Sequence, residues 1–437
     1  MSKSRTDSAA PRARRRFPRL PWTAVAITVL LAIGAIFSVP PVRDAVTLQP
    51  VAEVELTFSP SYLLLAPLWD VLDALTLLTV PQHIALLLSL LIVLAIVRVI
   101  ANRRRRNAGA PPRPLGRAIL GEAAVVAGFL VVFFGIYGIG VLIPRPMAEL
   151  LRKEQMIIAV DVHAHTRHSH DGRSGWTAED VRQWYQAAGF DAVYIADHRT
   201  FDGVIEGQGN NPIQVGQRTT ILPALELVYN GEHVNILSAG RKYAGLTTPD
   251  LRDMDTTALT LASAIPNAEP VLVQTFPGDF HEITPAHGPG TPGVRAIELI
   301  DGAPRGLRQT RNNRERIVHL ADSLNLALVS GSNNHGWGRT APGWTLFRIV
   351  GWQLMTPADL ADNIEAAIRR GGRNSTRVIE RVGTETEGAT LGITLPALVW
   401  RIATTLTTPQ RISWLAWTWA IALLALVLRR RRAPAAA

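Results

Sequence analysis

The stretch Ile157-Ile158-Ala159-Val160-Asp161-Val162-His163-Ala164-His165 decides the fold of the central part of the chain. Its first six residues are mostly β-branched or small and apolar, which predicts a buried strand. Two histidines separated by one residue follow. Because residues i and i+2 of a strand point to the same face, both imidazoles can reach one metal ion. The sequence therefore predicts a strand that ends in a pair of metal ligands.

Short β-branched runs alternate with helical stretches between residues 156 and 380. One helix is predicted to begin after Thr177 and to end before Gly189, and two more to span residues 313–324 and 357–370. Further strands are predicted at 192–196, 221–227, 234–237, 271–275, 294–300 and 326–330. This alternation predicts an α/β sheet or barrel.

Polar residues collect where these strands end. Asp197-His198 follows the second strand, Glu226 ends the third, and Gly331-Ser332-Asn333-Asn334-His335 follows the last. In an α/β barrel, functional groups converge at the carboxyl ends of the strands. Of the 11 histidines only His83 lies outside residues 163–335. The set of nitrogen and oxygen ligands, which includes Asp171 and His233, is large enough for more than one cation.

Cysteine is absent from the 437 residues, which excludes a disulfide scaffold, a cysteine-ligated zinc site and a thiol nucleophile. The net charge is +10, but residues 151–390 carry −4, so the other residues carry +14. Three arginine clusters dominate this excess: Arg12 with Arg14–Arg16, Arg103–Arg106, and Arg429–Arg432. Each cluster adjoins an apolar run, so we expect the basic clusters to be membrane anchors and not nucleic-acid contacts.

Four apolar runs are predicted to cross a lipid bilayer, namely residues 22–39, 83–100, 118–143 and 412–428. A signal peptide is the rival interpretation of the first run, but no small-x-small cleavage site precedes Pro40. Lysine and arginine accumulate on the cytoplasmic side, so all three arginine clusters should face inward. Four spans then place residues 144–411 outside and both termini in the cytoplasm, as in a multi-pass protein of the plasma membrane.

Two further apolar segments carry charge, residues 61–80 with Asp70 and Asp73, and residues 391–406 with Arg401. Making either one a span would leave an arginine cluster outside, so both are predicted to be interfacial or partly buried helices. The expected organisation is a membrane region at 1–150, a metal-dependent hydrolase domain at 151–385, and a C-terminal membrane segment at 386–437.

The motifs of the central region resemble a known family. His163-Ala164-His165-Thr166, Ser169-His170-Asp171-Gly172 and Ala196-Asp197-His198 are similar to the opening motifs of the polymerase and histidinol phosphatase (PHP) domain. Leu225-Glu226 with Gly231-Glu232-His233-Val234-Asn235, and the 331–335 motif, resemble its later motifs. The resemblance covers residues 157 to about 380. It implies a distorted seven-stranded (β/α) barrel that holds one to three divalent ions, Zn, Mn or Fe, and hydrolyses phosphate esters.

The resemblance also implies a ligand assignment. One ion would be held by His163, His165, Glu226 and Asn333, and a second by Glu226 and His233. A third would take Asp171, His198 and His335.

Two positions depart from the family pattern. Phe276 stands where the family commonly has a histidine ligand of the second metal, with His281 a few residues further on. Asn333 stands where the family has aspartate. An amide oxygen can coordinate a cation but adds no charge, so affinity for a hard cation should fall.

The expected reaction is metal-assisted hydrolysis, in which divalent ions lower the pKa of a bound water and neutralise charge on phosphoryl oxygens. No catalytic side chain beyond the metal-bound water is expected. Asp197 is predicted to orient a metal ligand such as His198. Arg199 and Arg339 are the candidates for binding a small anionic or phosphorylated substrate.

Two other functions stay open at this point. One is a degenerate PHP domain that binds a metal or ligand without turnover, which Phe276 and Asn333 favour. The other is hydrolysis of an amide or ester bond at the same kind of site, because a metal-activated water attacks those carbonyl groups too.

Overall fold

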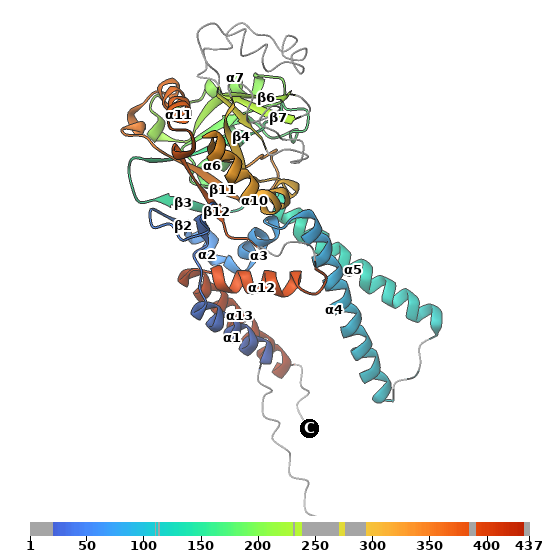
Figure 1. Cartoon of the computed structure of the whole chain (residues 1–437). Helices are drawn as coiled ribbons and strands as arrows, with labels where there is room; N and C mark the ends of the chain where they lie inside the picture. Colours follow the sequence, from blue (N-terminus) through green and yellow to red (C-terminus); the bar gives the residue numbers. More distant parts are fainter. Residues whose placement is uncertain are drawn as a thin grey trace, which may run out of the picture.

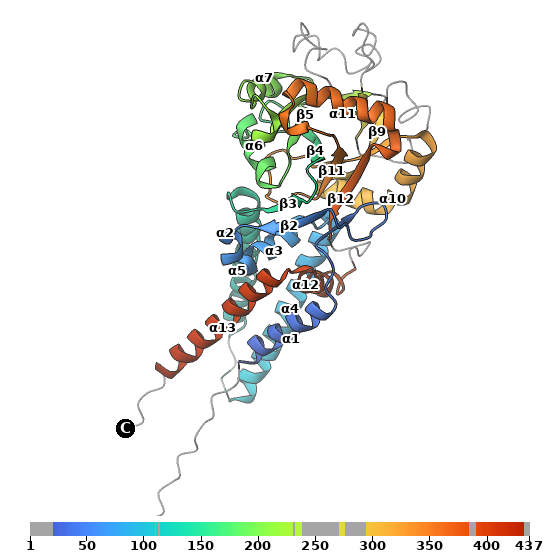
Figure 2. The same ribbon diagram turned by 90° about the vertical axis from the view of Figure 1, so that its left-hand side faces the viewer.

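The computed structural model describes residues 21–109, 111, 114–229, 232–237, 271–275, 294–383 and 390–431. It contains a mixed α/β domain from which apolar helices extend on one side (Figures 1 and 2). Phe276, His281 and the first arginine cluster, all singled out from the sequence, lie outside the described residues.

Ten strands form one sheet in the order β1-β12-β11-β4-β5-β6-β7-β8-β9-β10. Their bounds are β1 Val42–Asp44, β4 Ile157–Ala164, β5 Ala192–Ile195, β6 Thr220–Tyr229, β7 Glu232–Leu237, β8 Val271–Gln274, β9 Val294–Asp301, β10 Ala327–Gly331, β11 Gly343–Arg348 and β12 Thr376–Arg381. A separate pair, β2 Val54–Phe58 and β3 Ala148–Arg152, is antiparallel.

The sheet is curled, so that the loop after β10 contacts the carboxyl end of β4. Beyond β10, the Asn333 amide donates to the His163 carbonyl (3.0 Å), and the His165 amide donates to the Asn334 carbonyl (3.1 Å). Ala164 and Asn334 thereby form a parallel bridge. Strands β4 to β10 consequently surround a common space at the carboxyl end of β4.

Strand directions depart from a regular β/α repeat. The pairs β4-β5, β5-β6, β8-β9 and β9-β10 are parallel, whereas β7 is antiparallel to both β6 and β8. No room for a helix exists between β6 and β7, since they are adjacent in the chain as well as in the sheet. The seven strands first expected are present, but β11, β12 and β1 extend the sheet beyond them.

Three helices cover the sheet, α6 Ala178–Ala187, α10 Pro304–Leu324 and α11 Pro357–Gly371. Helix α6 begins with a capping box. The Thr177 hydroxyl accepts a hydrogen bond from the Asp180 amide, and the Asp180 carboxylate accepts one from the Thr177 amide. Each helix buries an apolar face, and all eight residues of β4 are buried. The first histidine pair is therefore carried by a strand at the centre of the core. A short helix, α7 Asp202–Gln208, follows β5.

The strands and helices expected around this core are present, with shifted ends. Helix α10 begins at Pro304, nine residues before the predicted start, because Pro304 occupies the first helical turn where its missing N–H is not needed. Strands β11 and β12 were not predicted. Trp344 of β11 is fully buried, and its indole donates to the Ala188 carbonyl (3.0 Å).

Within the part of the chain that the structure describes, three helices are long and apolar enough to cross a membrane: α4 Val80–Asn107, α5 Leu115–Leu142 and residues Thr408–Leu428 of α13 Thr408–Arg431. Helix α1 Trp22–Ile36 is apolar but has only 15 described residues, about 22 Å at ~1.5 Å per residue. Two charged residues inside these segments pair with each other, as Arg98 of α4 donates two hydrogen bonds of 2.9 Å to Glu122 of α5.

The two charged apolar segments are helical. The first divides into α2 Pro60–Leu64 and α3 Ala66–Thr76, and the second is α12 Thr394–Thr405, which lies across the ends of the long helices (Figure 1). Their acidic side chains are buried. Asp70 accepts hydrogen bonds from Gln410 and Trp414 (2.6 and 2.8 Å), and Asp73 forms 2.6 Å ion pairs with Arg145 and Arg381. Buried hydrogen bonds to Asp70 and buried ion pairs to Asp73 explain how an apolar segment carries these two acidic residues.

Candidate metal centre

Two buried histidines at the end of β4 form the base of the site. His163 and His165 are 1 % exposed or less, and their Nε2 atoms lie 3.0 Å apart. At most one of these nitrogens can carry a hydrogen toward the other. Two nitrogen lone pairs converging from one strand face are what a shared cation requires.

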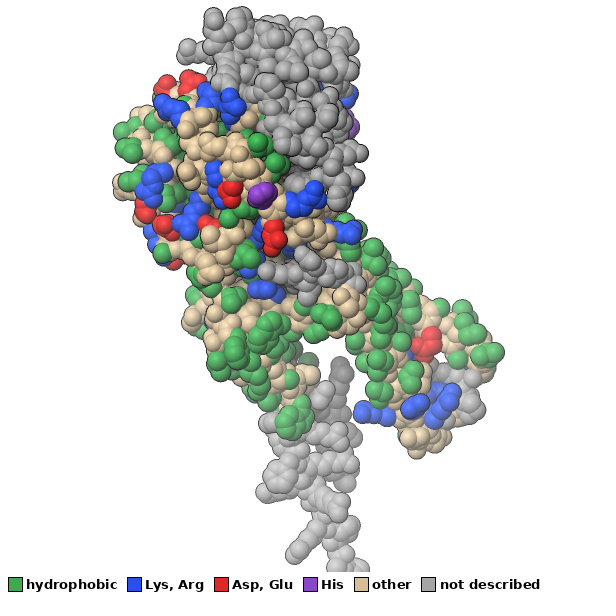
Figure 3. All heavy atoms as spheres, in the orientation of Figure 1, with side chains coloured by type: hydrophobic (Ala, Val, Ile, Leu, Met, Phe, Trp, Pro, Cys, Tyr) green, Lys and Arg blue, Asp and Glu red, His purple; other side chains and the backbone are tan. Residues whose placement is uncertain are grey.

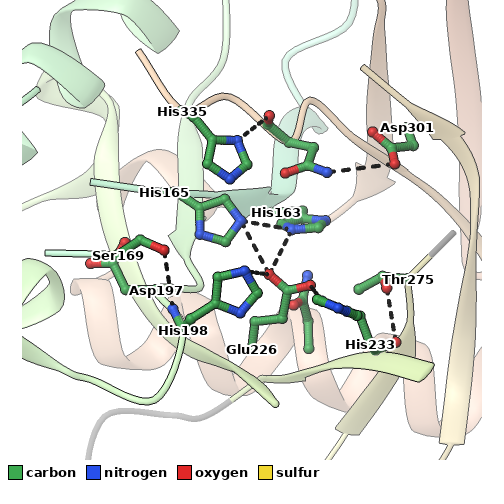
Figure 4. Close-up of polar contacts among 12 residues, drawn as sticks. His163, His165, Ser169, Asp197, His198, Glu226, His233, Thr275, Asp301 and His335 are labelled. Atoms are coloured by element: carbon green, nitrogen blue, oxygen red, sulfur yellow. Dashed lines mark hydrogen bonds and ion pairs between the residues drawn. The ribbon is translucent and has the colours of Figure 1, made fainter. Parts of the chain in front are cut away.

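Glu226 of β6 lies at the centre of the cluster (Figure 4). Its Oε2 is 3.2 Å from His163 Nε2, 3.1 Å from His165 Nε2 and 3.4 Å from His198 Nε2. Its Oε1 is 2.6 Å from His233 Nδ1. The antiparallel β6-β7 pair positions His233 here, because Val228 of β6 is its register partner and Glu226 is two residues away on the same face. One carboxylate thus contacts four imidazoles.

A second group faces Glu226 from the surface side. Asp171 Oδ2 lies 3.0 Å from His335 Nε2 and 3.5 Å from His198 Nε2. The His335 ring stacks on that of His165 at 4.1 Å between centroids. Asp171 comes from the loop after β4, His198 from the loop after β5 and His335 from the loop after β10.

The ligand atoms form three overlapping groups, each with its nitrogen and oxygen atoms within 4.8 Å of one another. They are His163-His165-Glu226, His165-Asp171-His198 and His198-Glu226-His233. These groups contain six of the eight predicted ligands, and a seventh, His335, lies 3.0 Å from Asp171. The eighth, Asn333, is joined to His163 through its backbone, and its side-chain Nδ2 donates to Asp301 Oδ2 (3.5 Å).

Buried charge in the cluster indicates that it needs a cation. Glu226 and Glu298 are both at most 2 % exposed, and both contact His163. Burial alone would lower the pKa of His163, but these two carboxylates raise it well above its ordinary value. Burial lowers the pKa of His165 to about 3. A proton on His163 hence balances the carboxylates, and a divalent ion among these atoms would replace that proton.

Neighbouring histidines lower the pKa values of two carboxylates of the cluster, Glu226 and Asp171. Burial would raise the pKa of Glu226, yet the charge of His163 and hydrogen bonds from three histidines hold it well below its ordinary value. Hydrogen bonds from His198 and His335 lower the pKa of Asp171 despite partial burial. Both carboxylates are ionised and available to a cation.

Two buried polar atoms of the site have no hydrogen-bond partner among the described residues, His165 Nδ1 and Asn333 Oδ1. An unpaired buried polar atom is costly, and Asn333 Oδ1 is a suitable ligand for a hard cation. The donor set, the buried charge and this unpaired oxygen fit a site for divalent metal ions.

Two acidic residues that position the ligands were not predicted. Glu298 of β9 accepts a hydrogen bond from His163 Nδ1 (2.8 Å), and a Cβ at Gly331 would collide with the Glu298 carboxylate. Asp161 accepts from the backbone amides of His163 (2.8 Å) and Ser332 (3.0 Å), joining β4 to the loop after β10. The sequence contains a signal for both residues, because each is an acidic residue inside a predicted buried strand and a buried charge must have a partner.

The three remaining candidates lie beside the ligands. Both described side-chain hydrogen-bonding contacts of Asp197 are to Thr166, from its backbone amide and from its hydroxyl, both at 2.6 Å. Asp197 therefore fixes the start of the loop that carries Asp171. Arg199 is exposed, with a left-handed backbone (φ 56°), and its amide donates to the Glu226 carbonyl (3.4 Å). Arg339 is half-buried, and burial and the charge of Arg145 lower its pKa.

No protein-family model matches the sequence. No curated protein matches it either.

Solved structures show similarity of fold over about half of the chain. PsfC from Pseudomonas syringae is 17 % identical over 56 % of this chain and 98 % of its own, with a TM-score of 0.36. A two-domain protein from Bacteroides vulgatus, described as containing a predicted PHP-like metal-dependent phosphoesterase, is 13 % identical over 51 % of this chain and 64 % of its own (TM-score 0.31). The lesion-specific endonuclease EndoQ from Pyrococcus furiosus is 13 % identical over 50 % and 57 %, with a TM-score of 0.35. The function of this chain has to be inferred from its own side chains.

Proposed function

We propose that the protein is a membrane-anchored, metal-dependent phosphoesterase with a PHP-type site. The observation that carries this proposal is the contact of one buried carboxylate, Glu226, with four imidazoles that come from β4, β7 and the loop after β5. Structural ion pairs do not need four imidazole rings around one acid, whereas clustered metal ions bridged by a carboxylate do.

The three groups of possible ligand atoms suggest three ion positions. His163, His165, Glu226 and Asn333 would hold one ion, Glu226 and His233 a second, and Asp171, His198 and His335 a third. Bound Zn, Mn or Fe ions would supply an activated water and neutralise the charge that develops on a phosphoryl group. This chemistry needs no cysteine or serine nucleophile, in agreement with the composition.

The other side chains hold this arrangement in place. Glu298 accepts from His163 Nδ1 and thereby directs Nε2 toward Glu226. Asp161 fixes the backbone of both His163 and Ser332. Arg199, next to His198 in the chain, is the proposed contact for the anionic substrate, and Arg339 is proposed for the same role.

The direction of the long helices supports an extracytoplasmic location for the domain. The starts of α4 and α13 and the ends of α1 and α5 face the α/β domain (Figures 1 and 2). Gln82 of α4 contacts Arg311 of α10 (3.1 Å), and Val141 of α5 accepts from the Gly338 amide (3.1 Å). Gln410 of α13 contacts Asp70 of α3. The opposite ends of α4 and α13 carry Arg103–Arg106 and Arg429–Arg431. By the positive-inside rule those ends are cytoplasmic, as are both termini.

One observation favours a second candidate, a metal- or ligand-binding module without turnover. The first metal position has a neutral carboxamide at Asn333, so it lacks one of the charges that hold a hard cation. Hydrolysis of an amide or ester bond would use the same ligands and differs only in substrate.

The deciding experiment uses the full-length protein purified in detergent. We expect hydrolysis of a generic phosphomonoester or phosphodiester that stops on chelation, returns when Mn or Zn is added back, and is lost in His165→Ala. His319→Ala, an exposed histidine on α10, is the matched control and should be unchanged. Metal bound without turnover of either ester would favour the binding module, and activity retained in His165→Ala would contradict the proposed site.

A further inference from the structure

A cavity of about 710 Å³ joins the metal centre to the long apolar helices α4 and α5. One end is lined by the metal ligands Asp171 and His335 together with Asn333. The opposite wall is made by Ile84, Leu87, Phe133, Phe134 and Val141. The volume is within the range of small-molecule sites, about 300–1,000 Å³.

The cavity is amphiphilic along its length. Its lining also includes Thr76, Thr340 and a polar pair, in which His83 Nδ1 is 2.7 Å from the Tyr137 hydroxyl. Thr76 donates to Thr340 (2.8 Å), and Thr340 donates to Asp73 (2.9 Å). The lining therefore combines proposed ion ligands, hydroxyl groups, and aliphatic and aromatic side chains.

Side chains of the apolar wall are also exposed on the outer surface of α4 and α5. Ile84 is 56 % exposed and Phe134 is 59 % exposed, although both line the cavity. Hydrophobic side chains cover the outer surface of α4 and α5 in this region (Figure 3). Where these helices cross a bilayer, such surfaces contact lipid tails, so a chain can pass sideways from the bilayer into the cavity.

The membrane helices also hold the ligand loop directly. The Gly338 amide donates to the Val141 carbonyl of α5 (3.1 Å), and Trp184 of α6 donates to the Gly338 carbonyl (3.1 Å). His335 is three residues before Gly338. The loop that carries His335 is thus hydrogen-bonded directly to α5, which forms part of the apolar wall. Trp337 of the same loop also lines the cavity and is half-exposed, as interfacial tryptophans are.

We propose that the substrate is a membrane lipid that bears a phosphate ester, with its head group at the metal centre and its hydrocarbon chain against α4 and α5. This inference rests on the proposed function for the reaction and on the cavity for the substrate class. A water-soluble phosphoester would leave the apolar wall in contact with water, whereas the hydrocarbon chain of a lipid would cover it. The lipid would come from the leaflet next to the α/β domain, because Ile84 and Leu87 lie in the first turns of α4.

The test compares two substrates that share a head group, one with a long acyl chain and one without, using full-length protein in nanodiscs. Leu87→Trp should fill the cavity, and Leu88→Trp is the control, since Leu88 is the next residue, 45 % exposed, and does not line the cavity. We expect Leu87→Trp to lower kcat/KM for the long-chain substrate at least about tenfold and to leave the short one unchanged. Leu88→Trp should leave both unchanged.

A second readout does not depend on turnover. A lipid phosphonate with a photoreactive group in its chain should label residues 84–87 and 133–141, and Leu87→Trp should reduce this labelling while its metal content stays at the wild-type level. Labelling without turnover of any phosphoester would retain the lipid site and overturn the proposed function. Equal turnover of both substrates in wild type and Leu87→Trp, with labelling spread over all lipid-facing helices, would overturn the lipid proposal alone.

Discussion

The Nδ1 atom of His163 lies 2.8 Å from Oε1 of Glu298, a carboxylate with no exposed surface that comes from five strands away in the sheet. This contact sets the orientation of His163, the first of the proposed metal ligands, because it commits Nδ1 to a hydrogen bond and leaves Nε2 facing Glu226. Carboxylate-histidine pairs of this kind also raise the basicity of the imidazole. The proposed metal centre would therefore depend on a residue that is not itself one of the proposed ligands.

Glu298→Gln should keep the shape of this residue and remove its charge. We expect metal affinity to fall about 10–100-fold, with little change in the elution volume of the purified protein. Metal titration followed by elemental analysis measures this loss. Glu365→Gln is the matched control, since Glu365 is equally buried but lies on α11 away from the ligands. Equal affinity in wild type and Glu298→Gln would show that His163 is oriented without this carboxylate.

Asn333→Asp should strengthen the first metal position. The added carboxylate lies near Asp301, which contacts the Asn333 amide at 3.5 Å, so repulsion should lower the unfolding temperature of the metal-free protein. A bound divalent ion removes that repulsion and gains a charged ligand, so the rise in unfolding temperature on adding Mn or Zn should exceed that of wild type. Thermal unfolding with and without metal gives both values. An unchanged metal-induced rise would mean that the residue at 333 is not a ligand.

Local patterns in the sequence were enough to predict the part of the site that local geometry creates. His163 and His165 share a strand face by spacing alone, and the loops with Asp171 and His198 follow directly from their strands. Glu298 and Asp161 were missed because their roles depend on which strands become neighbours in the curled sheet. That arrangement rests on contacts such as Ala164 with Asn334, which are 170 residues apart in the chain.

The long apolar helices show the same difference between local pattern and packing. Their positions follow from runs of apolar residues, which Arg98 and Glu122 interrupt. Their mutual pairing, and the cavity between α4, α5 and the ligand loop, depend on how separate elements pack. No periodicity of a single segment encodes such packing.

The proposed topology can be measured with single cysteines, because the natural chain has none. Ser323→Cys places a thiol on an exposed position of α10, and Ala108→Cys places one at the end of α4 beside the second arginine cluster. A membrane-impermeant maleimide on intact cells should label Ser323→Cys and not Ala108→Cys. After permeabilisation both should be labelled. Labelling of Ala108→Cys alone on intact cells would reverse the orientation and place the metal centre in the cytoplasm.

Asp70 should make stability depend on pH. Burial raises its pKa from 3.8 to about 6, against opposing hydrogen bonds from Trp414, Tyr62 and Gln410. A raised pKa means that the folded protein binds this proton more tightly than the unfolded chain, whose aspartates titrate near 3.9. The stabilisation is complete below about pH 4 and is lost as the pH rises through 6, a loss of about 2–3 kcal/mol at ~1.4 kcal/mol per pKa unit.

Asp70→Asn removes this titration, and it also costs one acceptor, so the variant should be less stable than wild type at low pH. The difference between the two proteins should shrink as the pH rises from 4 to 7, because only wild type loses stability through this group over that interval. Unfolding midpoints of the full-length protein in detergent at each pH measure this difference. Asp362→Asn, an exposed aspartate on α11, corrects for general effects of the charge. Parallel pH profiles for wild type and Asp70→Asn would mean that Asp70 keeps an ordinary pKa in the fold. In that case the hydrogen bonds from α13 would outweigh the cost of burying the charge.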